Sequence, residues 1–274
     1  AAYVAHHLTA RPDYITTLGV LVRPSSFKLF LANPCRVYRT SAIKWGNAKV
    51  APRLLLAWIW RIYHPERELS ITPNYGTSPP TFNIDIPEFK VVQSATILLT
   101  SDIIDHRTTI LRAVDQESGS TIIIKEQYPV ADYPAKEGPI IKNIHSAGSS
   151  PGIVRALAYG PVLNGDKEAA VRHVYEKDGS SYAQRKMRLV LNDSAESYMK
   201  IKTPKEALMV MYDLLEVTRI LYREKNILHR DISSRNILVR PEPVVLEGCA
   251  EIEGMYFLEY LLNKAQDRPT GYVR

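Results

Sequence analysis

The stretch that most constrains this chain is residues 227–239, which read Ile-Leu-His-Arg-Asp-Ile-Ser-Ser-Arg-Asn-Ile-Leu-Val. Asp231 and Asn236 stand five positions apart, and apolar residues flank them on both sides. This pattern is typical of a tight loop that leaves a helix and enters a buried strand. We therefore expect the carboxylate of Asp231 and the carboxamide of Asn236 to point into one cleft.

A long amphipathic helix is predicted directly before this loop. Thr203 suits the N-cap, Pro204 suits the first helical position, and Glu206 completes a capping box. Residues with apolar surface then recur at spacings of three and four, which predicts one buried stripe made of Ala207, Leu208, Met211, Leu214, Leu215, Thr218 and Leu221. The helix should span about twenty residues and end near Lys225 and Asn226.

The bulk composition indicates a soluble globular protein. The residues are 45% hydrophobic and 23% charged, which is ordinary for such a protein. The length of 274 residues is enough for one large domain or two modest ones. Cys35 and Cys249 lie far apart and form no metal or redox pattern. No signal peptide or membrane segment is recognisable, so we expect an intracellular protein, cytoplasmic or nuclear. The net charge of +6 is interpreted as spread along the chain, and no specific nucleic-acid partner is expected.

Three zones are predicted along the chain. Residues 1–88 form an N-terminal extension of unclear role, and Thr72–Pro80 within it suits a loop or linker. Residues 89–200 are rich in predicted strands and include a hairpin turn at Gln116–Ser120. The predicted strands are Ala95–Leu99, Thr109–Val114, Thr121–Lys125, Arg172–Tyr175 and Met187–Leu191. Residues 201–274 hold the helix, the loop and a short tail.

The loop resembles the catalytic loop of protein kinases, His-Arg-Asp-x-x-x-x-Asn. Further segments extend the resemblance to the fungal-type protein kinase domain family over roughly residues 85–240. They are Ile124–Tyr128, Glu137–Gly138, Pro151–Arg155, Arg188–Leu191 and Ile227–Ser233. This resemblance implies a bilobal, kinase-like α+β fold with a β-rich small lobe. It also implies an incomplete helical large lobe here, because only 38 residues follow Asn236. The implied chemistry uses ATP and Mg²⁺ and transfers phosphate to a hydroxyl group of a protein substrate.

The resemblance assigns roles within the loop. Asp231 corresponds to the catalytic base, and Asn236 corresponds to a ligand of the metal ion on the phosphates. His229 and Arg230 correspond to structural parts of the loop. The acceptor type stays open, because Ser233 stands where serine/threonine kinases usually carry a lysine.

Lys125 is the candidate cation for the nucleotide phosphates. It ends the β-branched run Thr121–Lys125, where a lysine is costly unless it faces a polar cleft or solvent. Glu137, which opens a plausible short helix, is its candidate partner, with Glu117 and Glu126 as nearby alternatives. We expect Lys125 and Asp231 to face one cleft.

The segment Ser101–Thr109 stands where kinases have a glycine-rich phosphate loop, but it contains no glycine. Its Asp102 and Asp105 side chains would repel phosphate. Arg107 and Thr108 are candidate nucleotide contacts on this segment.

Two departures from the kinase pattern follow the loop. No Asp-Phe-Gly motif occurs after Asn236, and Glu259 in Phe257–Tyr260 stands where the family has an aspartate that binds metal. Because the longer glutamate shifts the carboxylate by about an ångström, Glu259 is a weaker candidate metal ligand.

Two alternatives to an active protein kinase stay open. The missing glycines and the missing Asp-Phe-Gly motif favour a catalytically impaired pseudokinase that acts as a binding module. A small-molecule phosphotransferase of kinase-like fold is the third possibility. Arg230 argues against it, since those enzymes usually have a small residue between the histidine and the aspartate.

Overall fold

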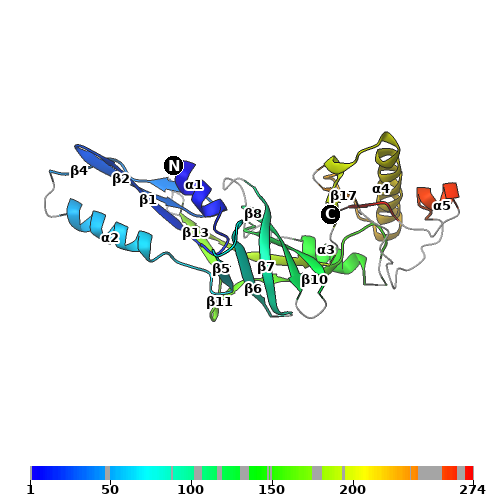
Figure 1. Cartoon of the computed structure of the whole chain (residues 1–274), viewed down its shortest axis with the longest axis horizontal. Coiled ribbons are helices and arrows are strands. Elements are labelled where there is room, and N and C mark those ends of the chain that lie inside the picture. The colour runs from blue at the N-terminus through cyan, green and yellow to red at the C-terminus, as the bar shows by residue number, and fades with distance from the viewer. Residues whose placement is uncertain are drawn as a thin grey trace. The chain divides into compact units, whose positions relative to one another are not determined.

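The computed structural model is a mixed α+β fold, which confirms the predicted fold class (Figure 1). It describes residues 2–46, 50–87, 89–101, 107–115, 119–129, 136–146, 148, 150–174, 181–192, 195–234, 236–239, 255–263 and 269–273. The chain divides into two compact units, Ala1–Ala135 with Tyr159–Leu189, and Lys136–Ala158 with Val190–Arg274. The predicted zones, with boundaries at residues 88 and 200, stay a prediction beside this division. Ile144 and Ile153 share a core cluster with the residues of the long helix after Thr203, so residues 136–158 belong to unit 2.

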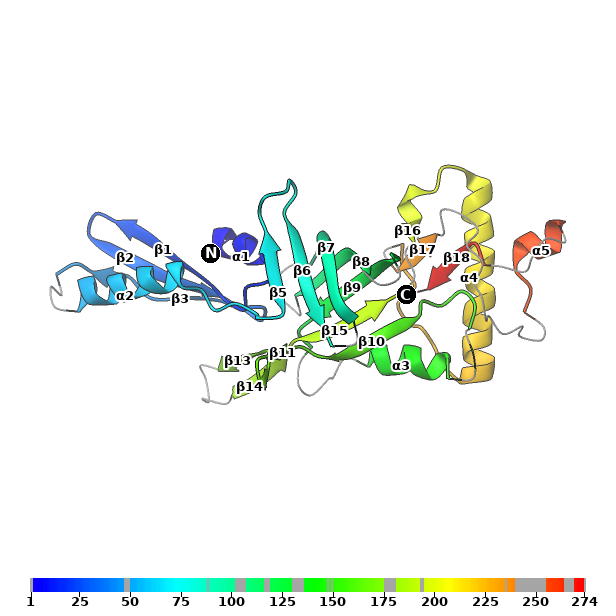
Figure 2. The same ribbon diagram turned by 60° about the horizontal axis from the view of Figure 1, so that its bottom comes forward.

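The first part of unit 1 is a small antiparallel sheet with a helix along it (Figure 2). Its elements are α1 (Ala2–Thr9), β1 (Thr17–Arg23), β2 (Ser26–Ala32), β3 (Val37–Arg39), β4 (Ile43–Lys44) and α2 (Ala51–Tyr63). One face of α2 packs on the sheet, where Phe27, Leu29 and Ala51 form a buried cluster. The indole Nε1 of Trp58 also donates to the carbonyl oxygen of Gly19 at 3.0 Å. The predicted extension therefore contains a folded module.

A seven-stranded sheet follows, in the order β10-β15-β9-β8-β7-β6-β5. Its strands are β5 (Ile71–Asn74), β6 (Thr81–Ile86), β7 (Phe89–Thr100), β8 (Thr108–Asp115), β9 (Thr121–Gln127), β10 (Ala156–Pro161) and β15 (Met187–Leu191). Two hairpins, β11–β12 (Leu163–Asn164, Lys167–Glu168) and β13–β14 (Ala170–Val174, Ser181–Arg185), lie between β10 and β15 in the sequence. All five predicted strands are present with different ends, although Tyr175, the last residue predicted for β13, lies outside the described residues.

The turns and loops next to this sheet agree less closely with those predicted from the sequence. Val114 pairs with Thr121, so β8 and β9 form the predicted hairpin, although residues 116–118 of its turn lie outside the described residues. The prediction of a loop over Thr72–Pro80 is wrong in its first part, because β5 extends to Asn74 and pairs with β6. Pro73 is compatible with this strand because β5 lies at the edge of the sheet.

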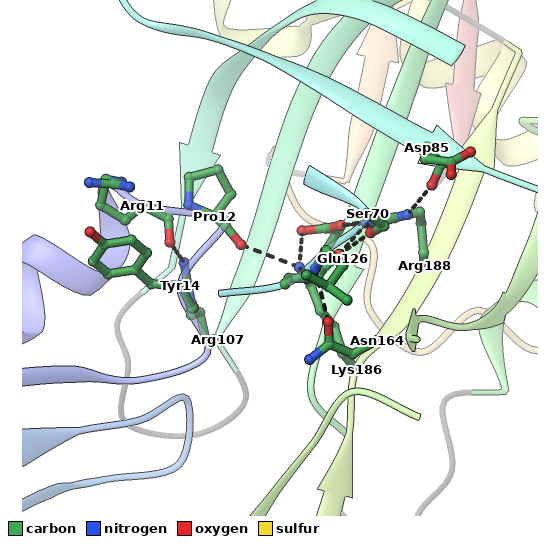
Figure 3. A network of polar contacts seen from close by, with 12 residues as sticks. Arg11, Pro12, Tyr14, Ser70, Asp85, Arg107, Glu126, Asn164, Lys186 and Arg188 are labelled. Atoms are coloured by element: carbon green, nitrogen blue, oxygen red, sulfur yellow. Dashed lines mark hydrogen bonds and ion pairs between the residues drawn. The ribbon is translucent and has the colours of Figure 1, made fainter. Parts of the chain in front are cut away.

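Four charged side chains lie buried together in unit 1, and Figure 3 labels three of them, Glu126, Lys186 and Arg188. Glu68, Glu126, Lys186 and Arg188 each expose between 1% and 6% of their surface. Lys186 Nζ lies 2.5 Å from Glu68 Oε2 and 2.7 Å from Glu126 Oε2. Arg188 Nη2 lies 2.8 Å from Glu68 Oε1 and 2.6 Å from Glu126 Oε1. We call these residues the buried quartet; its formal charges cancel.

The buried quartet joins the N-terminal extension to the sheet. Glu68 precedes β5, whereas Glu126 belongs to β9 and Arg188 to β15. Burial opposes ionisation of Glu126, but the charges of Lys186 and Arg188 prevail and lower its pKa to about 2. Since buried charges are stable only when paired, each member of the quartet depends on the others.

We predict that Arg188→Met lowers the free energy of unfolding of unit 1 by about 3–5 kcal/mol, because it leaves Glu68 and Glu126 with one cation between them. Urea unfolding followed by tryptophan fluorescence measures this change, since Trp45, Trp58 and Trp60 all lie in unit 1. The exposed Arg185→Met is the matched control and should change the value little. Equal stability of the two variants would contradict the role of the quartet.

Unit 2 is built around one long helix, α4 (Pro204–Lys225). Thr203 caps it by accepting the N–H of Glu206 at 3.2 Å, and Asn226 ends it in the left-handed conformation, which confirms the predicted ends. The remaining elements are α3 (Glu137–Ile144), β16 (Glu196–Ser197), a 3₁₀ turn (Tyr198–Lys200), β17 (Ile237–Val239), α5 (Leu258–Asn263) and β18 (Gly271–Val273). Strand β17 lies between β16 and β18.

The predicted buried stripe of α4 is mostly wrong. The buried residues of the helix are Val210, Asp213, Leu214, Val217, Ile220 and Leu221. Leu208 and Leu215 are instead 70% and 62% exposed. Both sets follow a spacing of three and four, so periodicity alone did not identify the packed face. Close approach of β18 selects it, since a Cβ on Gly271 would lie 2.7 Å from Val210 Cγ1.

Asp213 is a buried polar anchor in α4. Its Oδ1 accepts the N–H of Leu258 at 2.8 Å, and its Oδ2 accepts the N–H of Thr270 at 2.7 Å and the hydroxyl of Thr270 at 2.5 Å. One carboxylate thus holds both the start of α5 and the residue before β18 against the helix.

We predict that Asp213→Ala frees this C-terminal segment, because the substitution leaves buried N–H donors without an acceptor. Hydrogen exchange measured by mass spectrometry should show faster exchange in a peptide covering residues 269–273, with an opening free energy lower by about 3 kcal/mol. Glu224→Ala, at an exposed position of α4, should leave that peptide unchanged. Unchanged exchange in Asp213→Ala would contradict the anchor.

Candidate active site

The loop of residues 227–236 begins where α4 ends. Asn226 adopts φ 55°, and the N–H of Ile227 donates to the carbonyl oxygen of Leu221 at 3.0 Å. The loop then enters β17, whose first residue, Ile237, is buried in the core of unit 2. A helix end and a buried strand therefore fix both ends of the loop, as the sequence predicted.

Asp231 and Asn236 meet within this loop. Asn236 Nδ2 donates to Asp231 Oδ2 at 2.8 Å and to the carbonyl oxygen of Asp231 at 3.0 Å. The N–H of Asn236 also donates to the carbonyl oxygen of Ser233 at 2.9 Å. The predicted convergence of this carboxylate and carboxamide is therefore present. Because the amide nitrogen of Asn236 faces Asp231, its Oδ1 atom is the one turned away from that side chain.

The two residues before Asp231 shape the backbone. Arg230 adopts φ 61°, a left-handed conformation that is uncommon for a residue with a side chain. The N–H of Asp231 donates to His229 Nδ1 at 3.3 Å, which requires the proton of a neutral His229 ring to sit on Nε2. Asp231 itself is exposed. The Asp231 carboxylate is therefore accessible, and a hydrogen bond to His229 holds its backbone.

Lys125 lies on the half-exposed side of β9. Side chains alternate along a strand, and Ile122, Ile124 and Glu126 occupy the buried side. Lys125 therefore points to the opposite side from the buried quartet, next to Ile110 of β8. This placement fits the expectation that the lysine avoids the apolar core.

Arg107 occupies a different environment from the predicted nucleotide contact. It is 3% exposed, and its guanidinium donates to the carbonyl oxygens of Leu8 at 2.7 Å, Arg11 at 3.1 Å and Tyr14 at 3.4 Å. Burial lowers the pKa of this guanidinium. Figure 3 shows it beside Arg11 and Tyr14. Arg107 thus fastens the N-terminal segment to β8, which nothing in its local sequence indicated.

The other predicted site residues are placed as follows. Thr108 begins β8, and its N–H donates to Ser101 Oγ at 2.8 Å. Asp102 and Asp105 lie outside the described residues. Glu137 is the first residue of α3 in unit 2, whereas Lys125 belongs to unit 1, so their pairing stays a prediction. Glu259 is the second residue of α5, and its side chain lies outside the described part.

The donor atoms of the loop fit a hard cation better than a soft one. Asp231 and Asn236 offer carboxylate and carboxamide oxygens, the ligand type that Mg²⁺ prefers. In the described part of the chain, no group of three or more His, Cys, Asp or Glu residues is placed to hold a metal by itself. Because Mg²⁺ is usually held by one or two protein oxygens together with phosphate oxygens, the donor pair of Asp231 and Asn236 fits a magnesium ion that a phosphate also binds.

Comparison with known families gives a match that includes this loop. Residues 81–252, which include β6 to β17, match the profile of the family described as fungal protein kinase. The chain belongs to this family. The predicted resemblance is therefore confirmed, and membership supports a kinase-like function in general terms. A search of curated proteins gives no match. Among the described helices, none combines the length and apolar character needed to cross a membrane.

Arg230 has a strained backbone and lies in the loop that matches the kinase family, and backbone strain is often found at functional loops. We predict that Arg230→Gly keeps the loop and raises the free energy of unfolding of unit 2 by up to about 1 kcal/mol, because glycine adopts φ 61° without a steric penalty. Arg230→Val should lower it, since a β-branched residue resists this conformation.

Thermal unfolding of both variants, followed by circular dichroism, measures this difference. Arg223→Gly and Arg223→Val at an exposed position of α4 form the matched pair, where the helical backbone should make glycine the more costly of the two. The same ranking at both positions would contradict a left-handed Arg230.

Proposed function

We propose that this chain is a protein kinase that transfers the terminal phosphoryl group of ATP to a hydroxyl group of a protein, with Asp231 as the base. The observation that carries the proposal is the hydrogen bond of 2.8 Å between Asn236 Nδ2 and Asp231 Oδ2, within a loop of the matched family. Phosphoryl transfer requires mainly positioning and charge stabilisation, and these two groups supply both.

The proposed reaction starts at the acceptor hydroxyl. Asn236 occupies Oδ2 of Asp231, so Oδ1 is the atom available to accept the hydroxyl proton. The hydroxyl oxygen then bonds to the γ-phosphorus, the bond from that phosphorus to the bridging oxygen breaks, and ADP leaves. The hydrogen bond from the N–H of Asp231 to His229 fixes the backbone of the base during this transfer.

Asn236 Oδ1 is the proposed protein ligand for Mg²⁺, and Glu259 is a proposed second ligand by its place in the family pattern. When bound, the metal ion supplies positive charge next to the phosphate oxygens. Lys125 is proposed to add a further positive charge at the phosphates, because it lies on the half-exposed side of β9.

We predict that Asp231→Asn reduces phosphate transfer by about 100- to 10,000-fold, because it removes the proton acceptor. Radiolabelled ATP and a generic protein substrate measure the rate, and equilibrium dialysis measures ATP binding, which this variant should keep. Lys125→Met should weaken ATP binding about 10- to 100-fold, because it removes a charged hydrogen-bond donor. Asp166→Asn and Lys167→Met in the exposed β11–β12 turn are the matched controls.

The same assay separates the kinase from the pseudokinase. The absence of glycine in Ser101–Thr109 is the observation that favours a pseudokinase, since backbone amides approach phosphates most closely where side chains are missing. Binding of ATP without transfer by the unchanged chain would overturn the enzymatic proposal and support a binding module. Transfer that survives Asp231→Asn would overturn the assignment of the base.

A further inference from the structure

The net positive charge of this chain lies in one segment, residues 14–65, because that segment lacks carboxylates. Residues 14–65 contain no Asp or Glu and eight cationic residues, which are Arg23, Lys28, Arg36, Arg39, Lys44, Lys49, Arg53 and Arg61. The whole chain carries +6, so the rest of the chain is net −2. The expectation that the charge is spread along the chain is therefore wrong. A segment of this length without one carboxylate points to an anionic partner.

The helix of this module, α2, is apolar on two opposite sides. Its inner side packs on Phe27 and Leu29 through Leu55 and Trp58. On the outer side, Leu56 is 69%, Trp60 56% and Tyr63 78% exposed. These three residues follow a spacing of four and three, which places them on one face of the helix. Exposed apolar side chains gathered on one face of a helix mark an interaction surface.

Charge flanks this outer face. Arg53 lies three residues before Leu56 and is exposed, and Arg61 is exposed beside Trp60. Two further apolar side chains are exposed near the start of the helix: Val50 is 55% exposed and Val22 of β1 is 57% exposed. Val50 directly precedes Ala51, and Val22 pairs with Phe27 of β2. Ala51 and Phe27 share one buried cluster.

We propose that residues 14–65 bind the surface of an anionic phospholipid bilayer, with the outer face of α2 in the interface. Tryptophan and tyrosine favour this region of a bilayer because their rings are apolar with one polar group. Arginine side chains extend their apolar part along the interface and keep the guanidinium at the lipid phosphates. An apolar stripe with cations beside it is the pattern of helices that lie in the interface.

Two other occupants fit the face less well. A nucleic acid binds through cations across the contact surface, whereas here the centre of the face is Leu56, Trp60 and Tyr63. A second copy of the chain would bring two sets of unbalanced cations together, which opposes association. The anionic lipid surface satisfies both the charge and the apolar stripe.

The test uses the whole chain and vesicles. We expect it to sediment with vesicles of equal parts phosphatidylcholine and phosphatidylserine, and to bind weakly to pure phosphatidylcholine. Trp45, Trp58 and Trp60 are the three tryptophans of the protein, so a blue shift of its emission reports on this module alone. Binding should weaken with added salt, because the charge attraction is screened.

Variants separate the apolar from the charged contribution. Leu56→Ser combined with Tyr63→Ser should reduce binding to the anionic vesicles at least tenfold, and Arg53→Gln and Arg61→Gln should each reduce it about fivefold. Leu208→Ser combined with Leu215→Ser, which removes two equally exposed leucines from α4, is the matched control and should bind as the unchanged chain. Circular dichroism checks that each variant is folded.

Several results would overturn the proposal. They are equal binding to neutral and anionic vesicles, no binding to either, unchanged binding by the Leu56 and Tyr63 variant, and a preference for RNA over the vesicles in competition. A dimer in light scattering that this variant abolishes would assign the face to self-association instead. The assay contains no ATP, and Asp231→Asn should bind vesicles normally, so its outcome is independent of the proposed kinase activity.

Discussion

The buried quartet is the interaction on which unit 1 depends. Glu68, Glu126, Lys186 and Arg188 come from three distant parts of the sequence, and each is nearly excluded from water. Ion pairs of this kind contribute little net stability compared with apolar packing, but they penalise any arrangement that separates one partner. The quartet therefore sets which segments pack together, and Arg107 adds a second link to the N-terminal segment. Through Glu126 it also fixes β9, the strand that carries Lys125 on its other side.

In unit 2, a polar loop is held at both ends by residues of an apolar core. The cap at Asn226 and the buried Ile237 hold the two ends, and Asp213 fastens the C-terminal segment to the same helix. Between these anchors, a left-handed Arg230 and the hydrogen bond from Asn236 orient the Asp231 carboxylate.

Local features of this molecule were predictable from sequence, and long-range ones were not. The caps of α4, the strands of the sheet and the approach of Asp231 to Asn236 each depend on residues a few positions apart. The packed face of α4 was mispredicted because apolar residues occur on both sides, and β18, far along the chain, decides between them. Nothing local marks Glu68 as the partner of Lys186, 118 positions away. The lack of carboxylates in residues 14–65, which leaves eight cations unbalanced, was readable from sequence, but its interpretation required the exposed face of α2.

The central claim is that the loop carrying Asp231 and Asn236 binds a nucleotide through a metal ion. Isothermal titration of ATP into the unchanged chain, with Mg²⁺ and then with a chelator, tests it most directly. The account predicts binding in the presence of Mg²⁺ and a loss of most of that binding when the metal is removed. Equal affinity under both conditions, or no heat of binding in either, would contradict it.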